Sequence, residues 1–221
     1  MAQMHAIPLR QDDVFYPESD GQPMGETELH RDEIVYLIEA FKERFEEETD
    51  VYVGGDLFLY YRQGDPKAVI CPDVMVVRGV PKLPLRRTFR LWEEGEAPCL
   101  VVEVSSDSTQ GNDFASKKAL YERLGIEEYF LYDPLATRDP QLLGFRLADD
   151  GRYRSVAAGP QGSLASQTTG VTLRMEGERV RAVETATGRL FQRIPEMRKA
   201  RLALEEEVAR LRREVDRLSK A

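Results

Sequence analysis

Cys99-Leu-Val-Val-Glu-Val-Ser105 is an apolar segment with one acidic residue, Glu103, near its centre. Short apolar runs of this kind predict a buried strand. A second such run is Ala68-Val-Ile-Cys-Pro-Asp-Val-Met-Val-Val77, in which Asp73 follows Pro72. Carboxylates in buried strands are costly unless they are paired, hydrogen-bonded or bound to a metal. The two segments therefore predict central strands of a sheet. The acids within them predict where the functional site lies.

The segments around this pair predict helices and further strands. Residues 28–48 carry apolar side chains at helical spacing, with Thr27 as the N-cap. Further strands are predicted over 51–61, 128–134 and, as a small antiparallel region, 142–184, and a second helix over 113–124. A helix between the Glu103 strand and the 128–134 strand permits a parallel crossover. We therefore expect an α/β or α+β fold with a mixed sheet flanked by helices.

The last segment has a heptad pattern. One set of residues spaced by seven is Ile194, Arg201, Val208 and Val215, and the other is Met197, Leu204, Leu211 and Leu218. β-Branched residues at three a positions and leucine at three d positions favour a parallel two-stranded coiled coil. Glu207 at g can also meet Arg212 at e of a partner. We predict a homodimer through this helix; the alternative is that the helix packs on its own domain.

The predicted organisation is an extended arm over 1–27, a core domain over 28–192 and a coiled-coil helix over 193–221. The charge balance is acidic, with 39 Asp+Glu against 31 Lys+Arg. This balance counts against broad, sequence-independent DNA binding, although a local basic groove can lie on an acidic protein. The best basic patch is 83–90, and we interpret it as a solvated loop.

The two cysteines, Cys71 and Cys99, lie in predicted buried strands and lack the spacing of a zinc site. Free cysteine in such positions behaves as a small apolar residue. We therefore expect a reduced, cytoplasmic protein. No stretch of the sequence approaches the length of a membrane span, so no membrane partner is expected.

Asp73 and Glu103 would suit a hard cation if their strands are adjacent, because such cations prefer oxygen ligands. We predict that the two acids hold Mg²⁺, with Mn²⁺ as the alternative ion. For Asp73 the other interpretation is a solvent-facing acid at the end of a strand. For Glu103 it is a structural salt bridge to a lysine of a helix.

Three further residues are candidates for the same site. Lys117 lies on one face of the 113–124 helix together with Tyr121. Its ammonium could position a phosphate or assist a water nucleophile; a solvated helix lysine is the alternative. His30 lies at the start of the first helix. We assign Tyr121 and His30 to substrate binding. For His30 the alternative is an ordinary capping or surface histidine.

These residues, in this order, resemble the PD-(D/E)XK nuclease-like superfamily and, within it, the Uma-two family of bacterial restriction-endonuclease-like proteins. The resemblance covers most of the chain. It is carried by His30-Arg-Asp-Glu-Ile-Val35, Pro72-Asp73, Val102-Glu-Val-Ser-Ser106, Asp113-(x3)-Lys117-(x3)-Tyr121, Gly125-Ile-Glu-Glu-Tyr129 and Asp133-Pro134. Gly162-Ser-Leu-Ala-Ser166 and Thr187-Gly188 also match.

The resemblance implies a restriction-endonuclease-like fold and a catalytic set of Asp73, Glu103 and Lys117. The superfamily often has a lysine two residues after the second acid, where this chain has Ser105. In the family, this lysine usually lies on the following helix instead, and Lys117 matches that position. The leading hypothesis is thus a metal-dependent endonuclease that hydrolyses DNA phosphodiester bonds.

The alternative function is a non-catalytic, nuclease-like interaction or regulatory module that assembles through its C-terminal helix. Ser105 and the acidic balance favour it. Geometry discriminates the two hypotheses. Carboxylate oxygens that converge on one point near Lys117 favour the nuclease, whereas a direct Lys117–Glu103 salt bridge without a cleft favours the module.

Overall fold

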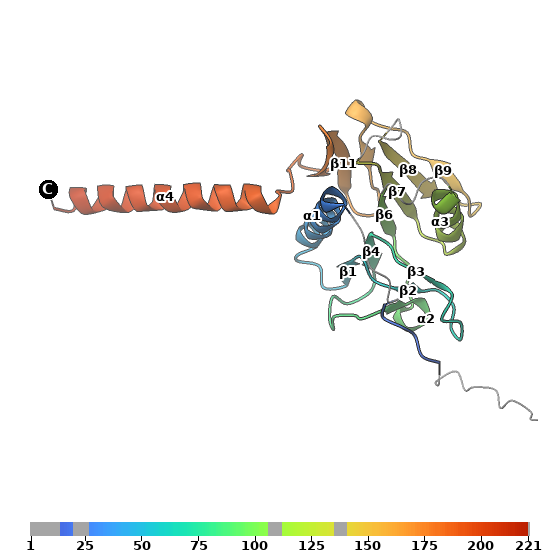
Figure 1. Ribbon diagram of the computed structural model, residues 1–221. Coiled ribbons are helices and arrows are strands. Elements are labelled where there is room, and N and C mark those ends of the chain that lie inside the picture. Colours follow the sequence, from blue (N-terminus) through green and yellow to red (C-terminus); the bar gives the residue numbers. More distant parts are fainter. Residues whose placement is uncertain (1–13, 20–26, 106–111, 135–140, 221) are drawn as a thin grey trace, which may run out of the picture.

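A six-stranded mixed sheet forms the centre of the computed structural model, which describes residues 14–19, 27–105, 112–134 and 141–220 (Figure 1). The strand order is β1-β4-β6-β7-β8-β9. These strands are β1 Val51–Gly54, β4 Val74–Arg78, β6 Leu100–Val104, β7 Glu128–Tyr132, β8 Leu142–Leu147 and β9 Tyr153–Ser155. This confirms the predicted mixed sheet.

Two helices cover the opposite faces of this sheet, as the alternation of side chains along its strands requires. Helix α1 (Glu28–Arg44) packs on the face that carries Val102 and Val104, while α3 (Asn112–Arg123) packs on the face that carries Val101. Strands β6 and β7 are parallel and α3 connects them, which confirms the predicted crossover. Thr27 caps α1, and its hydroxyl accepts a hydrogen bond from the His30 amide at 3.2 Å.

Two small sheets complete the body. One is antiparallel and has the order β10-β11-β12, with β10 Leu164–Ala165, β11 Val171–Glu176 and β12 Arg179–Glu184. The other has the order β3-β2-β5, with β2 Leu59–Tyr60, β3 Val69–Ile70 and β5 Phe89–Arg90. Short helices lie at Leu91–Glu94 (α2) and Pro160–Gly162 (η3). The predicted antiparallel region over 142–184 is thus divided, since β8 and β9 join the main sheet.

The structure corrects the prediction of one strand over 51–61 and one over 68–77. Each run is broken and contributes to two different sheets. The breaks meet each other, because the Asp56 amide donates to the Pro72 carbonyl at 2.9 Å. A side chain at Gly55 would place its Cβ 2.0 Å from the Asp73 carbonyl oxygen, so only glycine permits this approach.

The C-terminal helix α4 (Ile194–Leu218) extends away from the body (Figure 1). Polar contacts fix its first turn. Arg193 donates to the buried Glu33 carboxylate of α1 at 2.9 Å, and Arg181 donates to both carboxylate oxygens of Glu196 at 2.8 and 2.7 Å. None of its residues is buried. Prediction of the helix is confirmed, and its apolar a and d residues remain 39% to 65% exposed within the described chain.

No helix among the described residues is both long and apolar enough to cross a membrane.

Candidate functional site

The two predicted acids lie opposite each other on neighbouring strands. Strand β4 pairs with β6 antiparallel, and Val74 is the partner of Val102. Continuing this register by one residue sets Asp73 opposite Glu103, and directly opposed residues of an antiparallel pair lie side by side. The break before β4 leaves Asp73 outside the strand, where its Oδ2 accepts a hydrogen bond from the Val104 amide at 2.7 Å.

Glu103 is buried, and both oxygens of its carboxylate are engaged by α3. Lys117 Nζ donates to Oε2 at 2.7 Å, and the Tyr121 hydroxyl donates to Oε1 at 2.5 Å. Burial and the neighbouring Asp73 carboxylate raise the pKa of Glu103 to about 8, although Lys117 and Tyr121 favour its ionised form. Burial and the neighbouring acid thus oppose the ionised form of Glu103 more strongly than Lys117 and Tyr121 stabilise it.

A second buried acid of the sheet shows the opposite behaviour. Burial opposes ionisation of Glu128, but hydrogen bonds from Ser166, the Gln167 amide and Arg146 outweigh it and lower the pKa of Glu128. Glu128 is thus a satisfied structural carboxylate. The two acids differ in their partners: hydrogen-bond donors outweigh burial at Glu128, whereas burial, together with the neighbouring Asp73, outweighs Lys117 and Tyr121 at Glu103.

The two adjacent lysines of α3 point to different places. The Lys117 side chain is 21% exposed and reaches Glu103. Lys118 Nζ lies 4.2 Å from the centre of the Phe145 ring. The direct salt bridge between Lys117 and Glu103 is the contact expected of a structural Glu103 and of the non-catalytic module. The two acids beside Lys117 are the arrangement expected of the nuclease, so each hypothesis has one observation in its favour.

The two candidates for substrate binding are buried. Tyr121 is fully buried, and its hydroxyl holds Glu103. His30 is 3% exposed; its Nε2 lies 2.7 Å from the Val104 carbonyl oxygen and 3.7 Å from Asp73 Oδ2. Both side chains thus contact the acids or their strand, and this burial suits a positioning role rather than contact with a substrate.

Comparison with known proteins supports the fold and shows the family. A family model described as "Uma2: Putative restriction endonuclease" matches residues 1–176, which is more than half of the chain. The chain belongs to the Uma2 family. A crystal structure of an Anabaena variabilis protein, described as a putative nuclease belonging to DUF820, is similar to this Uma2 chain, with a TM-score of 0.50 and 13% sequence identity. The match covers 73% of this chain and 91% of that one, and it supports the fold alone. No curated protein gives a significant match.

Restriction-endonuclease-like families generally use divalent metals. Within the described residues, no group of three or more His, Cys, Asp and Glu side chains could hold a metal ion. The Uma2 site instead offers two opposed carboxylates, the ligands that hard cations prefer, and Asp73 is one cause of the raised pKa of Glu103. The donor chemistry therefore fits one small cation whose remaining ligands are water or a phosphate oxygen.

Sequence reasoning missed the role of the Val104 backbone. Its amide donates to Asp73 and its carbonyl accepts from His30, so the backbone of one residue joins the acid to α1. A backbone contact leaves no signal in residue type. Cys71 also differs from the prediction, since it is half-buried outside any strand. Its thiol lies 3.6 Å from Asp56 Oδ1, and burial together with the neighbouring acids raises its pKa to about 12, so it is not a reactive thiol.

Proposed function

We propose that this chain is a metal-dependent endonuclease that hydrolyses DNA phosphodiester bonds, with Asp73, Glu103 and Lys117 as catalytic residues. The observation that carries the proposal is the opposed pair Asp73–Glu103 with the Lys117 ammonium 2.7 Å from Glu103. Mg²⁺ held by the two acids, or Mn²⁺ in its place, would polarise the scissile phosphate and lower the pKa of a bound water.

The chain's own residues then have separate tasks. Lys117, partly exposed at the edge of the acids, neutralises charge that develops on the phosphate. Tyr121 fixes the orientation of Glu103 through its hydroxyl. His30 forms a hydrogen bond with the Val104 carbonyl and so fixes the end of β6. The Val104 amide at this end orients Asp73. The support of ligands by neighbouring hydrogen bonds is a general requirement of metal sites.

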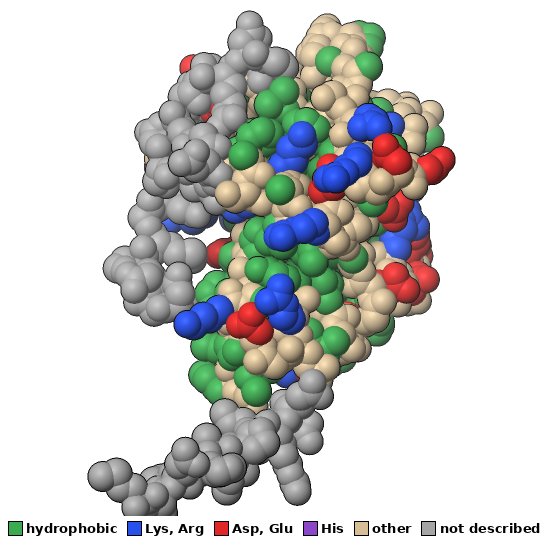
Figure 2. All heavy atoms as spheres, turned by 90° about the vertical axis from the view of Figure 1, so that its right-hand side faces the viewer, with side chains coloured by type: hydrophobic (Ala, Val, Ile, Leu, Met, Phe, Trp, Pro, Cys, Tyr) green, Lys and Arg blue, Asp and Glu red, His purple; other side chains and the backbone are tan. Residues whose placement is uncertain are grey.

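The DNA contact is proposed on the face that carries α3. Figure 2 shows lysine and arginine side chains spread over an apolar part of this face, while acidic side chains gather along one edge. The basic patch over 83–90 is a weaker choice. Its arginines are neutralised, because Arg86 pairs with Glu94 at 2.6 Å, Arg87 with Glu18 at 2.6 Å and Arg90 with Glu93 at 2.9 Å.

The second candidate function is a non-catalytic, nuclease-like module. One observation favours it: both oxygens of Glu103 are already bound, by Lys117 and Tyr121. A carboxylate oxygen has a further lone pair for a metal, so this engagement does not block ligation. An activity measurement separates the two functions.

The test is incubation of plasmid and single-stranded DNA with Mg²⁺ or Mn²⁺. We expect cleavage by the wild-type chain and none by Asp73→Asn, which keeps the side-chain shape but lowers the ligand charge. Glu206→Gln, an exposed acid on the outer face of α4, is the matched control and should cleave like the wild type. Equal cleavage by wild type and Asp73→Asn, or none by either with both ions, contradicts the proposal.

We also propose that the chain is a homodimer through a parallel coiled coil of α4, with the arm, core and helix over 1–27, 28–192 and 193–221. The apolar a and d residues are partly or largely exposed, from 39% for Val208 to 65% for Leu218. In a parallel pair Glu207 at g meets Arg212 at e of the other helix. The charge pattern therefore favours the parallel arrangement.

A further inference from the structure

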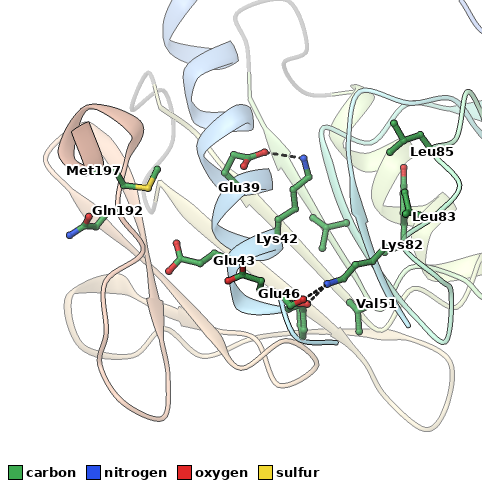
Figure 3. Close-up of a pocket in the computed structure, with 13 residues that line it drawn as sticks. Glu39, Lys42, Glu43, Glu46, Val51, Lys82, Leu83, Leu85, Gln192 and Met197 are labelled. Carbon is green, nitrogen blue, oxygen red and sulfur yellow. Dashed lines mark hydrogen bonds and ion pairs between the residues drawn. The ribbon is translucent and has the colours of Figure 1, made fainter. Parts of the chain in front are cut away.

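A groove of about 610 Å³ lies on the body beside the first turns of α4. Figure 3 shows Glu43 of α1 and Glu46, just after the end of α1, between Met197 on one side and the loop that carries Lys82 and Leu83 on the other. Phe45 and Val51, both buried, contribute to its floor. The groove thus combines an apolar floor with acidic side chains from α1.

One wall of the groove is fixed although it exposes apolar side chains. Lys82 Nζ donates to the carbonyl oxygens of Phe45 at 2.5 Å and Glu46 at 2.7 Å, which ties the loop to the end of α1. Leu83 and Leu85 of the same loop are 69% and 83% exposed. Two exposed leucines on a held loop are typical of a surface that another molecule covers.

The groove is continuous with the heptad face of α4. Met197 lines the groove and is also the first d residue of the heptad pattern. Side chains at d point toward the partner helix in a coiled coil. The face of α4 that pairs with a second α4 therefore lies next to the groove. In a parallel pair, the first turn of the partner helix lies at the opening of the groove.

We propose that this groove receives the first turns of α4 from a second copy of the chain, an inference that rests on the homodimer proposed above. Three acids and two lysines line the groove, namely Glu39, Glu43, Glu46, Lys42 and Lys82. The charge that the incoming turn can meet is on Glu46, and that turn carries the partner's Arg198 and the partner's Lys199. Glu39 pairs with Lys42 and Glu43 with Arg189, but the Glu46 side chain is exposed and available.

The contact also resolves a weakness of the helix. Arg201 occupies an a position and pairs with Glu205 of its own helix at 3.0 Å, so one layer of the coiled coil lacks an apolar pair. Few apolar layers follow Arg201, so the pair of helices would be only weakly stable on its own. Burial of Leu83 and Leu85 against the partner would stabilise the dimer at the end of the helix that Arg201 weakens.

The experiment is sedimentation equilibrium of the full chain and its variants. Leu83→Ser with Leu85→Ser should weaken dimerisation by at least about tenfold, because two exposed leucines lose their cover. Leu202→Ser is the matched control: Leu202 is 58% exposed but lies outside both the heptad face and the groove, and its dimer should equal the wild type.

A charge exchange tests the orientation. Glu46→Lys and Arg198→Glu should each weaken the dimer, and the double variant should recover most of the affinity. If the serine and single-charge variants dimerise as tightly as the wild type, the groove assignment is wrong and the coiled coil stands. A wild-type chain that is monomeric at all concentrations overturns the dimer and the groove together. Neither result bears on DNA cleavage, which is measured separately.

Discussion

Replacing Glu103 by glutamine should make the metal-free protein more stable at alkaline pH while it removes metal binding. Glutamine keeps the contacts, since its carbonyl oxygen can accept from Lys117 while its amide donates to the Tyr121 hydroxyl oxygen. What it removes is the buried negative charge beside Asp73. The expected gain in stability therefore measures the cost of burying the Glu103 charge beside Asp73.

The sign follows from linkage. The pKa of Glu103 is about 8 in the folded chain, above its usual value of 4.5. Between these values the folded state binds more protons than the unfolded state, so the wild-type free energy of unfolding falls as pH rises through this window. Each pKa unit corresponds to about 1.4 kcal/mol, and the loss for this buried group is on the order of a few kcal/mol.

Thermal unfolding from about pH 6 to about pH 9, without divalent metal, measures the effect. The glutamine variant should lack the fall in stability and should melt several degrees above the wild type at the upper end, given roughly 2–4 °C per kcal/mol for a chain of this size. Glu128→Gln is the matched control: its buried carboxylate has a lowered pKa, so the variant should be less stable than the wild type at neutral pH. Parallel pH profiles for wild type and Glu103→Gln would refute the reasoning.

Three further outcomes are expected. Lys117→Met should abolish cleavage, whereas Lys118→Met, which loses only its contact with Phe145, should cleave at nearly the wild-type rate; equal rates would remove Lys117 from the mechanism. His30→Ala should lower the free energy of unfolding by about 1–3 kcal/mol in denaturant titrations and weaken Mn²⁺ binding, because the Val104 carbonyl loses a buried partner; unchanged metal affinity would confine His30 to stability. Removal of 199–221 should convert a dimer into a folded monomer by light scattering, since Glu196 and its contacts with Arg181 remain; a truncated dimer would assign the helix another purpose.

The sequence predicted the elements that depend on local pattern. The apolar stripe after Thr27 predicted α1, and the helix between two apolar strands predicted the parallel pair of β6 and β7. The run over 51–61 was predicted as one strand because most of its residues favour strands, and the pair Gly54-Gly55 within it marks a bulge or a close backbone approach. The backbone that approaches Gly55 is the Asp73 carbonyl, and this tertiary contact is not contained in the local pattern.

The site was predictable to the same extent. A carboxylate within an apolar strand is costly, so Asp73 and Glu103 stood out as residues that need a partner. Their opposition depends on the register of β4 and β6, and the hold of Tyr121 on Glu103 depends on where α3 packs. The Val104 peptide contacts depend on backbone position alone. These parts require coordinates because strand register and helix placement decide them.

Isothermal titration of the wild-type chain with Mn²⁺ tests the central claim most directly, since that claim is a metal-dependent site at the opposed acids. The account predicts saturable binding to the wild type, with loss of the binding heat in both Asp73→Asn and Glu103→Gln, while Glu128→Gln binds like the wild type. Equal Mn²⁺ affinity in the wild type and the Glu103→Gln variant would contradict it.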